Sequence, residues 1–317
     1  MKKSIIILYG PTATGKSDCA TKLAREFPLE IINGDVGQLY APLSIGTAKP
    51  DWKNEKAPHH LFDILNEPSD YTVVNYRVAV VALCEQIWAR GNIPCIVGGS
   101  GFYLKSLFFA PEPEVPDFTE SIRVIPTIDD LSDEDAWYLL ARYDAVRAAQ
   151  IHPHDRYRIE RAFTILKTKQ TASGQQPRYT PLDFPVLFLC LTRDRKALYD
   201  RINHRTQLMI DQGWIEEVIQ LEGTPWASFL KKKKLIGYSE IFEYLKHSEI
   251  TKSELIRAIA QKTRHYAKRQ MTFWRLIEKQ LGDCVIEPSC LALCESSSDD
   301  HMYTQVYDQV RLFLTKI

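Results

Sequence analysis

The sequence lacks several features that would place it in a special class of protein. It has no net charge, because 40 Lys and Arg balance 40 Asp and Glu over 317 residues. Any nucleic acid would therefore have to bind at local basic patches, because the field of the whole molecule is weak. No apolar run is long enough to span a membrane, and residues 1–3 lead into a strand-like run without a signal peptide. We expect a cytoplasmic protein without membrane contact.

Cysteine is sparse, and its spacing is irregular. The chain has seven cysteines and no C-x-x-C pair. Four lie inside apolar segments and are predicted to be core thiols: Cys19, Cys84, Cys95 and Cys190. Near the C-terminus, three cysteines and a histidine could be drawn as a zinc site, but their spacing favours free or structural thiols: Cys284, Cys290, Cys294 and His301.

The most informative segment that is present follows the apolar run at residues 4–9. Residues 10–17 read GPTATGKS and match the phosphate-binding pattern G-x-x-x-x-G-K-[ST] at every position. In this pattern, backbone N–H groups and a helix N-terminus surround a di- or polyphosphate. Lys16 adds a positive charge, and the Ser17 hydroxyl is a ligand for Mg²⁺. The alternative, a glycine-rich turn without a ligand, fits the flanking strand and helix patterns less well.

The first third of the chain alternates strand and helix patterns. Strands are predicted at residues 4–9, 30–34, 60–64 and 93–97, and helices at 16–27 and 73–89. A further apolar run at 185–191 reads as a return to the same sheet. The pattern predicts an α/β fold, a P-loop NTPase-like parallel sheet flanked by helices, with an inserted small helical domain and a mostly helical C-terminal part.

Domain boundaries are predicted from breaks in these patterns. A proline-rich break at 111–117 precedes a polar stretch with helices predicted at 136–149 and 156–169. We therefore expect the core to comprise residues 1–116 and 183–295, and the inserted helical domain residues 117–182. Later helices are predicted at 195–211, 215–222, 237–247 and 252–280. Residues 296–317 are predicted to be a linker and an amphipathic helix.

Three polar segments are predicted to share one edge of the sheet with the P-loop. Asp35 follows the second strand, where it could hold a metal through water or accept a proton; a turn-capping role is the alternative. Residues 45–50 (IGTAKP) suit phosphate or acceptor contacts, although a solvated loop is the better interpretation of this segment taken alone. Residues 98–101 (GGSG) follow the fourth strand and allow close approach of a ligand, or form a plain strand-to-helix turn.

Basic residues gather in three places. Arg193, Arg195, Arg201 and Arg205 follow the returning strand, and planar guanidinium groups suit a pyrophosphate. Residues 154–161 (HDRYRIER) interleave arginine with an aromatic residue. On the late helix, four cations fall on one face: Arg257, Arg264, Lys268 and Arg275. Such patterns suit phosphate contacts and base stacking on RNA, whereas a solvated charged face is the alternative for each.

Taken together, these segments resemble the bacterial-type tRNA dimethylallyltransferases (tRNA isopentenyltransferases). The matching pieces run in the family's order: residues 10–17, Asp35 with Gln38 and Tyr40, 45–50, 98–100, 152–161, 236–238 and 264–270. The resemblance implies transfer of a dimethylallyl group from dimethylallyl diphosphate to N6 of the adenosine beside the tRNA anticodon. Diphosphate leaves in this reaction. The P-loop, which is also found in ATP-binding proteins, would therefore hold the leaving group here.

The resemblance also implies roles for individual residues. Asp35 would be the base that takes the N6 proton, and Thr12 would contact the bridging oxygen of the diphosphate. Lys16, Arg205 and Mg²⁺ on Ser17 would stabilise the departing charge. The diphosphate would be held by Gly10, Pro11, Thr12, Ala13, Thr14, Gly15, Lys16, Ser17 and Arg205.

Contacts to the anticodon stem-loop are implied as well. Those near the target adenosine would come from Asp35, Val36, Gly37, Gln38, Thr47, Lys49, Ser100 and Gly101. Those to the rest of the arm would come from the inserted domain and the late helix, through Arg156, Tyr157, Arg158, Arg161, Arg264 and Lys268. The chain departs from the family at Val36, where serine is usual, and in a shorter insertion between Asp117 and His152. We expect a monomer.

Three other functions remain open on the sequence. An adenylate isopentenyltransferase acting on free adenine nucleotides would share the P-loop and the base, but would not need the insertion or the basic helix. A P-loop small-molecule kinase would consume ATP and would leave residues 46–50 unexplained. An RNA-binding protein without activity would not need an intact set of Thr12, Lys16, Ser17, Asp35 and Arg205.

Overall fold

The computed structural model describes residues 3–110, 126–167, 173, 178–179, 182, 184–282, 291–296 and 298–317. The chain forms two compact units, Met1–Phe108 with Pro181–Ile317, and Phe109–Thr180. Over the described residues, no helix is both long and apolar enough to cross a membrane. The proline-rich break at 111–117, Cys284 and Cys290 lie outside the described residues.

The first unit is built on a six-stranded sheet whose neighbouring strands are all parallel. The strands are β1 (Ile5–Tyr9), β2 (Leu29–Asn33), β3 (His59–His60), β4 (Ile93–Gly98), β7 (Val186–Thr192) and β8 (Leu291–Glu295). They lie in the order β3-β2-β4-β1-β7-β8. The four central strands are buried along their whole length, as a parallel sheet covered on both faces requires. Their carboxyl ends meet at one edge, where parallel sheets bind ligands.

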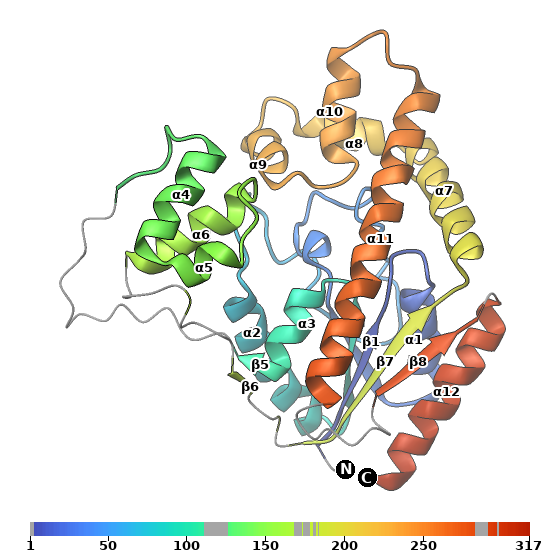
Figure 1. Ribbon diagram of the computed structural model, residues 1–317. Coiled ribbons are helices and arrows are strands. Elements are labelled where there is room, and N and C mark those ends of the chain that lie inside the picture. The colour runs from blue at the N-terminus through green and yellow to red at the C-terminus, as the bar shows by residue number, and fades with distance from the viewer. Residues whose placement is uncertain are drawn as a thin grey trace. The chain divides into compact units, whose positions relative to one another are not determined.

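Helices cover both faces of this sheet (Figure 1). On one face, Leu23 and Val306 belong to a core that includes alternate residues of the strands. On the other face, the Trp274 ring stacks on Tyr9 at 6.0 Å between ring centroids and meets Phe188 edge-on at 5.0 Å. The helices of the first face are α1 (Lys16–Glu26) and α12 (Asp299–Lys316), and those of the second include α2 (Val73–Ala89), α3 (Gly101–Phe108) and α11 (Lys252–Gly282).

A second apolar core in the same unit holds the segment after β2. Trp214, Tyr238 and Phe242 from the later helices pack with Tyr40 and Leu43. This packing fixes residues 40–50 beside the carboxyl edge of the sheet. The elements that contribute are the 3₁₀ helix η1 (Val36–Leu39), α7 (Arg195–Asp211), α8 (Trp214–Leu221), α9 (Pro225–Lys233) and α10 (Tyr238–Lys246).

The second unit is a small helical domain with its own core. Side-chain caps begin its helices, because the Ser132, Asp144 and Asp155 oxygens accept hydrogen bonds from backbone N–H groups. Leu140 and Phe163 lie at the centre of its core. The elements are α4 (Asp133–Tyr143), α5 (Ala145–Ala149), α6 (Arg156–Leu166) and an antiparallel pair, β5 (Phe109–Ala110) with β6 (Arg178–Tyr179).

The predicted fold class is confirmed, but several elements differ from their predicted form. Only residues 59–60 form a strand where 60–64 was predicted. The helix predicted at 136–149 is two helices, because Asp144 ends α4 and caps α5. Helices α3 and α9 and strand β8 were not predicted. Strand β8 extends the sheet beside β7, and α12 packs on that sheet. Residues 298–317 therefore belong to the core of the first unit and not to a detached tail.

Candidate active site

The loop between β1 and α1 has a conformation that requires its glycines. Gly10 and Gly15 have φ angles of 150° and 97°, which other residues rarely adopt. A Cβ at Gly10 would also lie 2.1 Å from the carbonyl oxygen of Leu191. Lys16 begins α1 directly after this loop. The loop amides and the helix N-terminus thus have the arrangement in which P-loops bind phosphate.

Gln270 on α11 holds this loop from outside. Its side-chain oxygen accepts a hydrogen bond from the Thr12 N–H at 2.9 Å, and its side-chain nitrogen donates to the Gly99 carbonyl at 2.9 Å. The Tyr9 hydroxyl donates to the Gln270 carbonyl at 2.7 Å. Gln270 therefore ties the P-loop to the loop after β4. No role was predicted for Gln270 from the sequence. The feature that could have indicated one is its position, because it is a polar residue on the buried stripe of α11 that contains Trp274.

Lys16 is a buried cation at the floor of the loop. Its ammonium donates to the Pro11 carbonyl at 2.8 Å, and the residue is 8% exposed. Burial lowers the pKa of Lys16 to about 8, although the nearby Asp35 carboxylate opposes this shift. A poorly solvated ammonium held by one carbonyl is available to an anionic ligand, which would raise its pKa again.

Arg205 approaches the loop from α7. Its guanidinium donates to the Thr12 hydroxyl, so the structure brings together two residues that lie far apart in the sequence. Burial lowers the pKa of Arg205, while Asp35 favours its charged form. Two desolvated cations, Lys16 and Arg205, thus face one loop whose ligand would be anionic.

Asp35 lies just beyond the end of β2, opposite the loop after β4. Its Oδ1 accepts a hydrogen bond from the Gly99 N–H at 2.6 Å and a longer one from the Ser100 hydroxyl at 3.4 Å. The Asn33 side chain fixes the backbone on both sides, because its oxygen accepts from the Asp35 N–H at 2.8 Å and its nitrogen donates to the Asp35 carbonyl at 3.0 Å. This carboxylate is therefore held in a fixed direction, as a general base requires.

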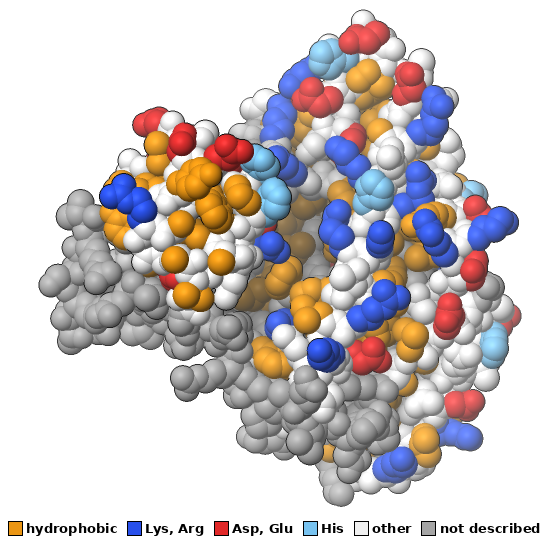
Figure 2. Space-filling model, viewed as in Figure 1, with side chains coloured by type: hydrophobic (Ala, Val, Ile, Leu, Met, Phe, Trp, Pro, Cys, Tyr) orange, Lys and Arg blue, Asp and Glu red, His pale blue; other side chains and the backbone are white. Residues whose placement is uncertain are grey.

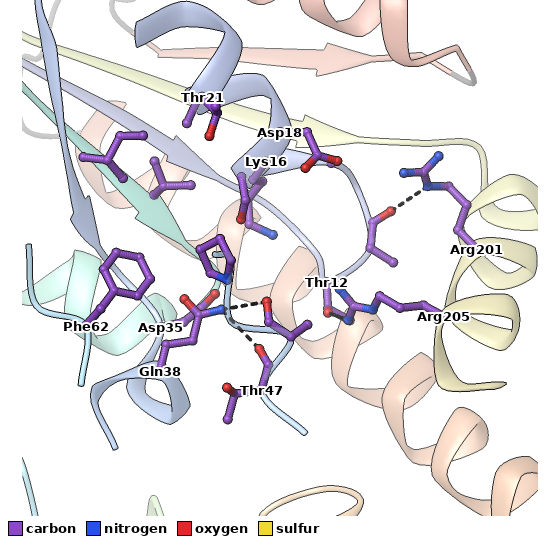
Figure 3. Close-up of a pocket in the computed structure, with 18 of the residues that line it drawn as sticks. Thr12, Lys16, Asp18, Thr21, Asp35, Gln38, Thr47, Phe62, Arg201 and Arg205 are labelled. Atoms are coloured by element: carbon purple, nitrogen blue, oxygen red, sulfur yellow. Dashed lines mark hydrogen bonds between the residues drawn. The ribbon is translucent and has the colours of Figure 1, made fainter. Parts of the chain in front are cut away.

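Lys16, Asp35 and Arg205 line one cavity of about 440 Å³. Figure 3 shows Thr12, Arg201 and Arg205 on one side and Phe62 with Gln38 on the other. The charged side suits a diphosphate, and the side with aromatic and aliphatic groups suits an apolar or planar ligand. Of the predicted site residues, the cavity includes Thr12, Ala13, Gly15, Lys16, Ser17, Asp35, Gln38, Thr47 and Arg205.

Residues 45–50 form a wall of this cavity through internal hydrogen bonds. The Gln38 side chain donates to the carbonyls of Thr47 at 3.1 Å and Ala48 at 3.3 Å. The Lys49 ammonium donates to the Tyr40 carbonyl at 2.8 Å and pairs with Asp63. The Lys49 side chain is only 4% exposed, so it has a structural role here, and its predicted tRNA contact stays a prediction.

The other residues predicted at this edge make close packing contacts: Val36, Gly37, Ser100 and Gly101. The Val36 N–H donates to the Ser100 hydroxyl at 3.1 Å, which places that hydroxyl beside Asp35. A Cβ at Gly37 would lie 2.9 Å from a methyl carbon of Thr47, and one at Gly101 would lie 2.2 Å from the Phe273 ring. Both glycines are required for close packing of the site.

Glu217 on α8 was not predicted, yet it anchors the 45–50 wall. Its carboxylate accepts hydrogen bonds from the N–H groups of Ser44 at 2.9 Å, Ile45 at 2.7 Å and Gly46 at 3.1 Å. The Tyr238 hydroxyl donates to the same carboxylate at 2.7 Å. An acidic residue on a helix gives no signal of such a distant partner in the sequence.

Both units contain basic residues that are predicted to contact RNA. In the helical unit, Arg156 is committed to structure, because it donates to the Leu131 carbonyl at 2.7 Å and to Glu160 at 2.9 Å. Tyr157 is 75% exposed, and Arg158, which pairs with Asp155 at 3.0 Å, is also exposed. Arg161 has an exposed side chain as well.

Helix α11 presents most of its predicted cations to solvent, and Figure 2 shows Lys and Arg side chains along the face over this helix. Arg257, Lys268 and Arg275 are exposed. Arg264 is half-buried, because it donates to the Asn203 side chain at 2.5 Å and stacks over Tyr199. Arg264 therefore also ties α11 to α7.

The residues present fit a divalent cation that binds together with a diphosphate. Ser17 lies exposed in the first turn of α1 and lines the cavity beside Lys16. Within the described residues, no group of three or more His, Cys, Asp or Glu side chains could hold a metal ion on its own. A cation here would take the Ser17 hydroxyl and phosphate oxygens as ligands.

A parallel sheet with a P-loop and a facing carboxylate at its carboxyl edge defines a P-loop α/β enzyme. The family model for IPP transferase matches residues 38–276, and that for isopentenyl transferase matches residues 3–62. The chain is 37% identical to a tRNA dimethylallyltransferase of Citrifermentans bemidjiense, over 86% of this chain and 89% of that one. It is 36% identical to the tRNA dimethylallyltransferase of Bacillus subtilis, over 86% and 88%. The chain belongs to the tRNA dimethylallyltransferase family.

Solved structures agree with this assignment. A full-length tRNA isopentenylpyrophosphate transferase from Bacillus halodurans superimposes with a TM-score of 0.67 at 26% identity, over 99% of this chain and 98% of that one. A eukaryotic dimethylallyltransferase, described as acting on tRNA, superimposes with a TM-score of 0.76 at 26% identity, over 98% of this chain and 78% of that one.

Proposed function

We propose that this enzyme transfers a dimethylallyl group from dimethylallyl diphosphate to N6 of the adenosine next to the anticodon of tRNA, releasing diphosphate. The observation that carries this proposal is the cavity that holds Asp35 and Thr12 together with the cations Lys16 and Arg205. Family membership supports the same reaction. A carboxylate opposite a diphosphate site is the arrangement that proton removal with loss of diphosphate requires.

Asp35 acts as the base in this proposal. The N6 lone pair is delocalised into the purine, so the amine attacks well only if a base takes its proton as the C–N bond forms. The hydrogen bonds from Gly99 and Ser100 to Oδ1 hold the carboxylate in place, and the described contacts leave Oδ2 to receive the proton. The target base has to leave the stack of the anticodon loop to reach this edge.

The P-loop holds the leaving group. Diphosphate gains negative charge as the C–O bond breaks, and the poorly solvated cations Lys16 and Arg205 stabilise that charge together with the loop N–H groups. We expect the Thr12 hydroxyl, which is bonded to Arg205, to contact the bridging oxygen, as the family resemblance implies. Mg²⁺, if held by Ser17 and the phosphates, would supply further neutralisation of the diphosphate charge.

Exposed aromatic and basic residues would bind the anticodon arm. Tyr157 and Arg158 in the helical unit, and Lys268 and Arg275 on α11, are exposed and suit stacking and phosphate contacts. Because Arg156 and Lys49 are engaged within the protein, we expect smaller contributions from them. A cytoplasmic monomer acting on tRNA remains our expectation.

The test is incubation of the protein and Mg²⁺ with dimethylallyl diphosphate and either unmodified tRNA or AMP, followed by mass spectrometry of nucleosides. We expect prenylated adenosine from tRNA and none from AMP. Product from AMP alone would instead assign an adenylate isopentenyltransferase. If neither reaction gives product and ATP is consumed with a small acceptor, the protein is a kinase. tRNA binding without any turnover would indicate an inactive RNA-binding protein.

A further inference from the structure

The C-terminal helix α12 places a carboxylate beside the phosphate-binding loop. Asp299, the first residue of α12, pairs with Arg193 and with Arg201, whose Nη1 lies 3.0 Å from Oδ2 of Asp299. A Cβ built at Gly15 would lie 3.4 Å from the Asp299 carboxylate. This contact comes from residues beyond the end of the IPP transferase family match at 276.

The two arginines in turn hold carbonyl groups of the loop. Arg201 Nε donates to the Ala13 carbonyl at 3.0 Å, and Arg193 Nε donates to the Thr14 carbonyl at 3.0 Å. In a planar trans peptide, the C=O of one residue and the N–H of the next point in opposite directions. A carbonyl fixed towards an arginine therefore fixes the following N–H in the opposite direction. Here these are the N–H groups of Thr14 and Gly15.

We propose that Asp299 is a positioning residue for the diphosphate. By pairing with Arg193 and Arg201, it holds both guanidinium groups on the Ala13 and Thr14 carbonyls, so that the Thr14 and Gly15 N–H groups face the ligand. It also offsets the positive charge of the Arg193 side chain, which is 0% exposed. Residues 298–317 are thereby part of the candidate active site. The assignment of diphosphate as the ligand rests on the proposed function.

The charges around Asp299 agree with this arrangement. Burial by itself would raise the pKa of the Asp299 carboxyl, but the guanidinium groups of Arg193 and Arg201 outweigh it and lower the pKa. Asp299 is therefore ionised when the enzyme works. The two arginines would otherwise repel each other, and the more exposed Arg201 would be the one to move away from the loop.

The test compares Asp299→Asn with Asp300→Asn. Both residues lie in the first turn of α12, so both changes remove one negative charge from the same helix end. The Asp300 side chain is 96% exposed and lies 3.8 Å from the Lys22 ammonium. We expect Asp299→Asn to raise the Kd for Mg²⁺–pyrophosphate by calorimetry, and the KM for dimethylallyl diphosphate, roughly tenfold. The KM for tRNA should not change, and Asp300→Asn should behave as wild type.

A second readout separates positioning from general stability. Hydrogen exchange of the backbone should become faster in residues 13–15 of Asp299→Asn than in the strands of the sheet, and Asp299→Glu, which keeps the charge, should recover part of the affinity. Equal pyrophosphate affinity in Asp299→Asn and Asp300→Asn, or tighter binding in the former, would overturn the inference. Because pyrophosphate binding needs no prenyl transfer, a wild-type protein inactive on tRNA would refute the proposed function while leaving this test intact.

Discussion

At the scale of single residues, the site combines a fixed carboxylate with desolvated cations. Asp35 is oriented by the Gly99 N–H and by Ser100, and Lys16 is buried with only the Pro11 carbonyl as its described hydrogen-bond partner. Lys16 is poorly solvated, so a ligand that compensates its charge gains more than it would in water. The chemistry thus depends on a few atoms whose directions are set by neighbours.

The first prediction concerns Asp35. Asp35→Asn keeps an oxygen to accept from the Gly99 N–H but cannot take a proton, so we expect kcat to fall by at least about 10²-fold. The Kd for tRNA should stay within about twofold. Single-turnover kinetics and filter binding would measure the two quantities, with Asp51→Asn, an exposed change in a nearby loop, as the control. A variant that keeps most of its kcat would remove Asp35 as the base.

At the scale of elements, α11 connects the candidate site at the sheet edge to an exposed basic face. Its buried stripe carries Gln270, which braces the P-loop, and its exposed stripe carries Lys268 and Arg275. One helix thus contributes to the sheet core, the loop geometry and the basic surface. Helix α11 can contribute to all three because it packs over the central strands, and these strands end at the site.

The second prediction concerns the basic stripe of α11. Arg264→Ala with Lys268→Ala should weaken tRNA binding and reduce the slope of log K against log salt, because fewer counterions are released. The control is Lys252→Ala with Lys262→Ala, which removes the same charge from the same helix. In the protein, Lys252 pairs with Asp211 and Lys262 pairs with Glu240. Salt slopes that are equal in the two double variants would show that the stripe does not contact tRNA.

At the scale of the whole molecule, a buried charge cluster supports the sheet away from the site. Glu30 on β2 is fully buried and accepts hydrogen bonds from Arg90 at 2.9 and 2.6 Å and from Asn92 at 2.8 Å, with His60 at 2.7 Å. Burial raises the pKa of Glu30, but the hydrogen bonds from Arg90, Asn92 and His60 outweigh it and lower the pKa to about 2.

The third prediction is an acid-dependent loss of stability at Glu30. Its folded pKa lies below the ordinary value of 4.5, so its contribution is present above about pH 5 and is lost as the pH falls towards 2. We expect Glu30→Gln to lower the free energy of unfolding by about 3 kcal/mol at pH 6, and by progressively less towards pH 2. Glu85→Gln, at an exposed pair with Lys3, should show little effect in the same urea titrations. A difference that is constant with pH would contradict this interpretation.

The fold class, the P-loop and the family could all be predicted from the sequence. These are local properties: a continuous apolar run indicates a buried parallel strand, and the loop glycines are required by backbone angles that few other residues adopt. Asp35 and Arg205 were also found from the sequence, Asp35 because the carboxyl ends of parallel strands share one edge and Arg205 through the family resemblance.

Which distant groups meet at that edge depends on how the elements pack, and this could not be predicted from the sequence. Gln270 on the P-loop, Glu217 on residues 44–46, and Asp299 on Arg193 and Arg201 are contacts between elements far apart in the chain. No periodicity encodes them, because an exposed acid on a helix and a carboxylate that anchors a loop look the same in sequence. Likewise, the partners that Lys49 and Arg156 have within the protein are visible only once the chain is packed.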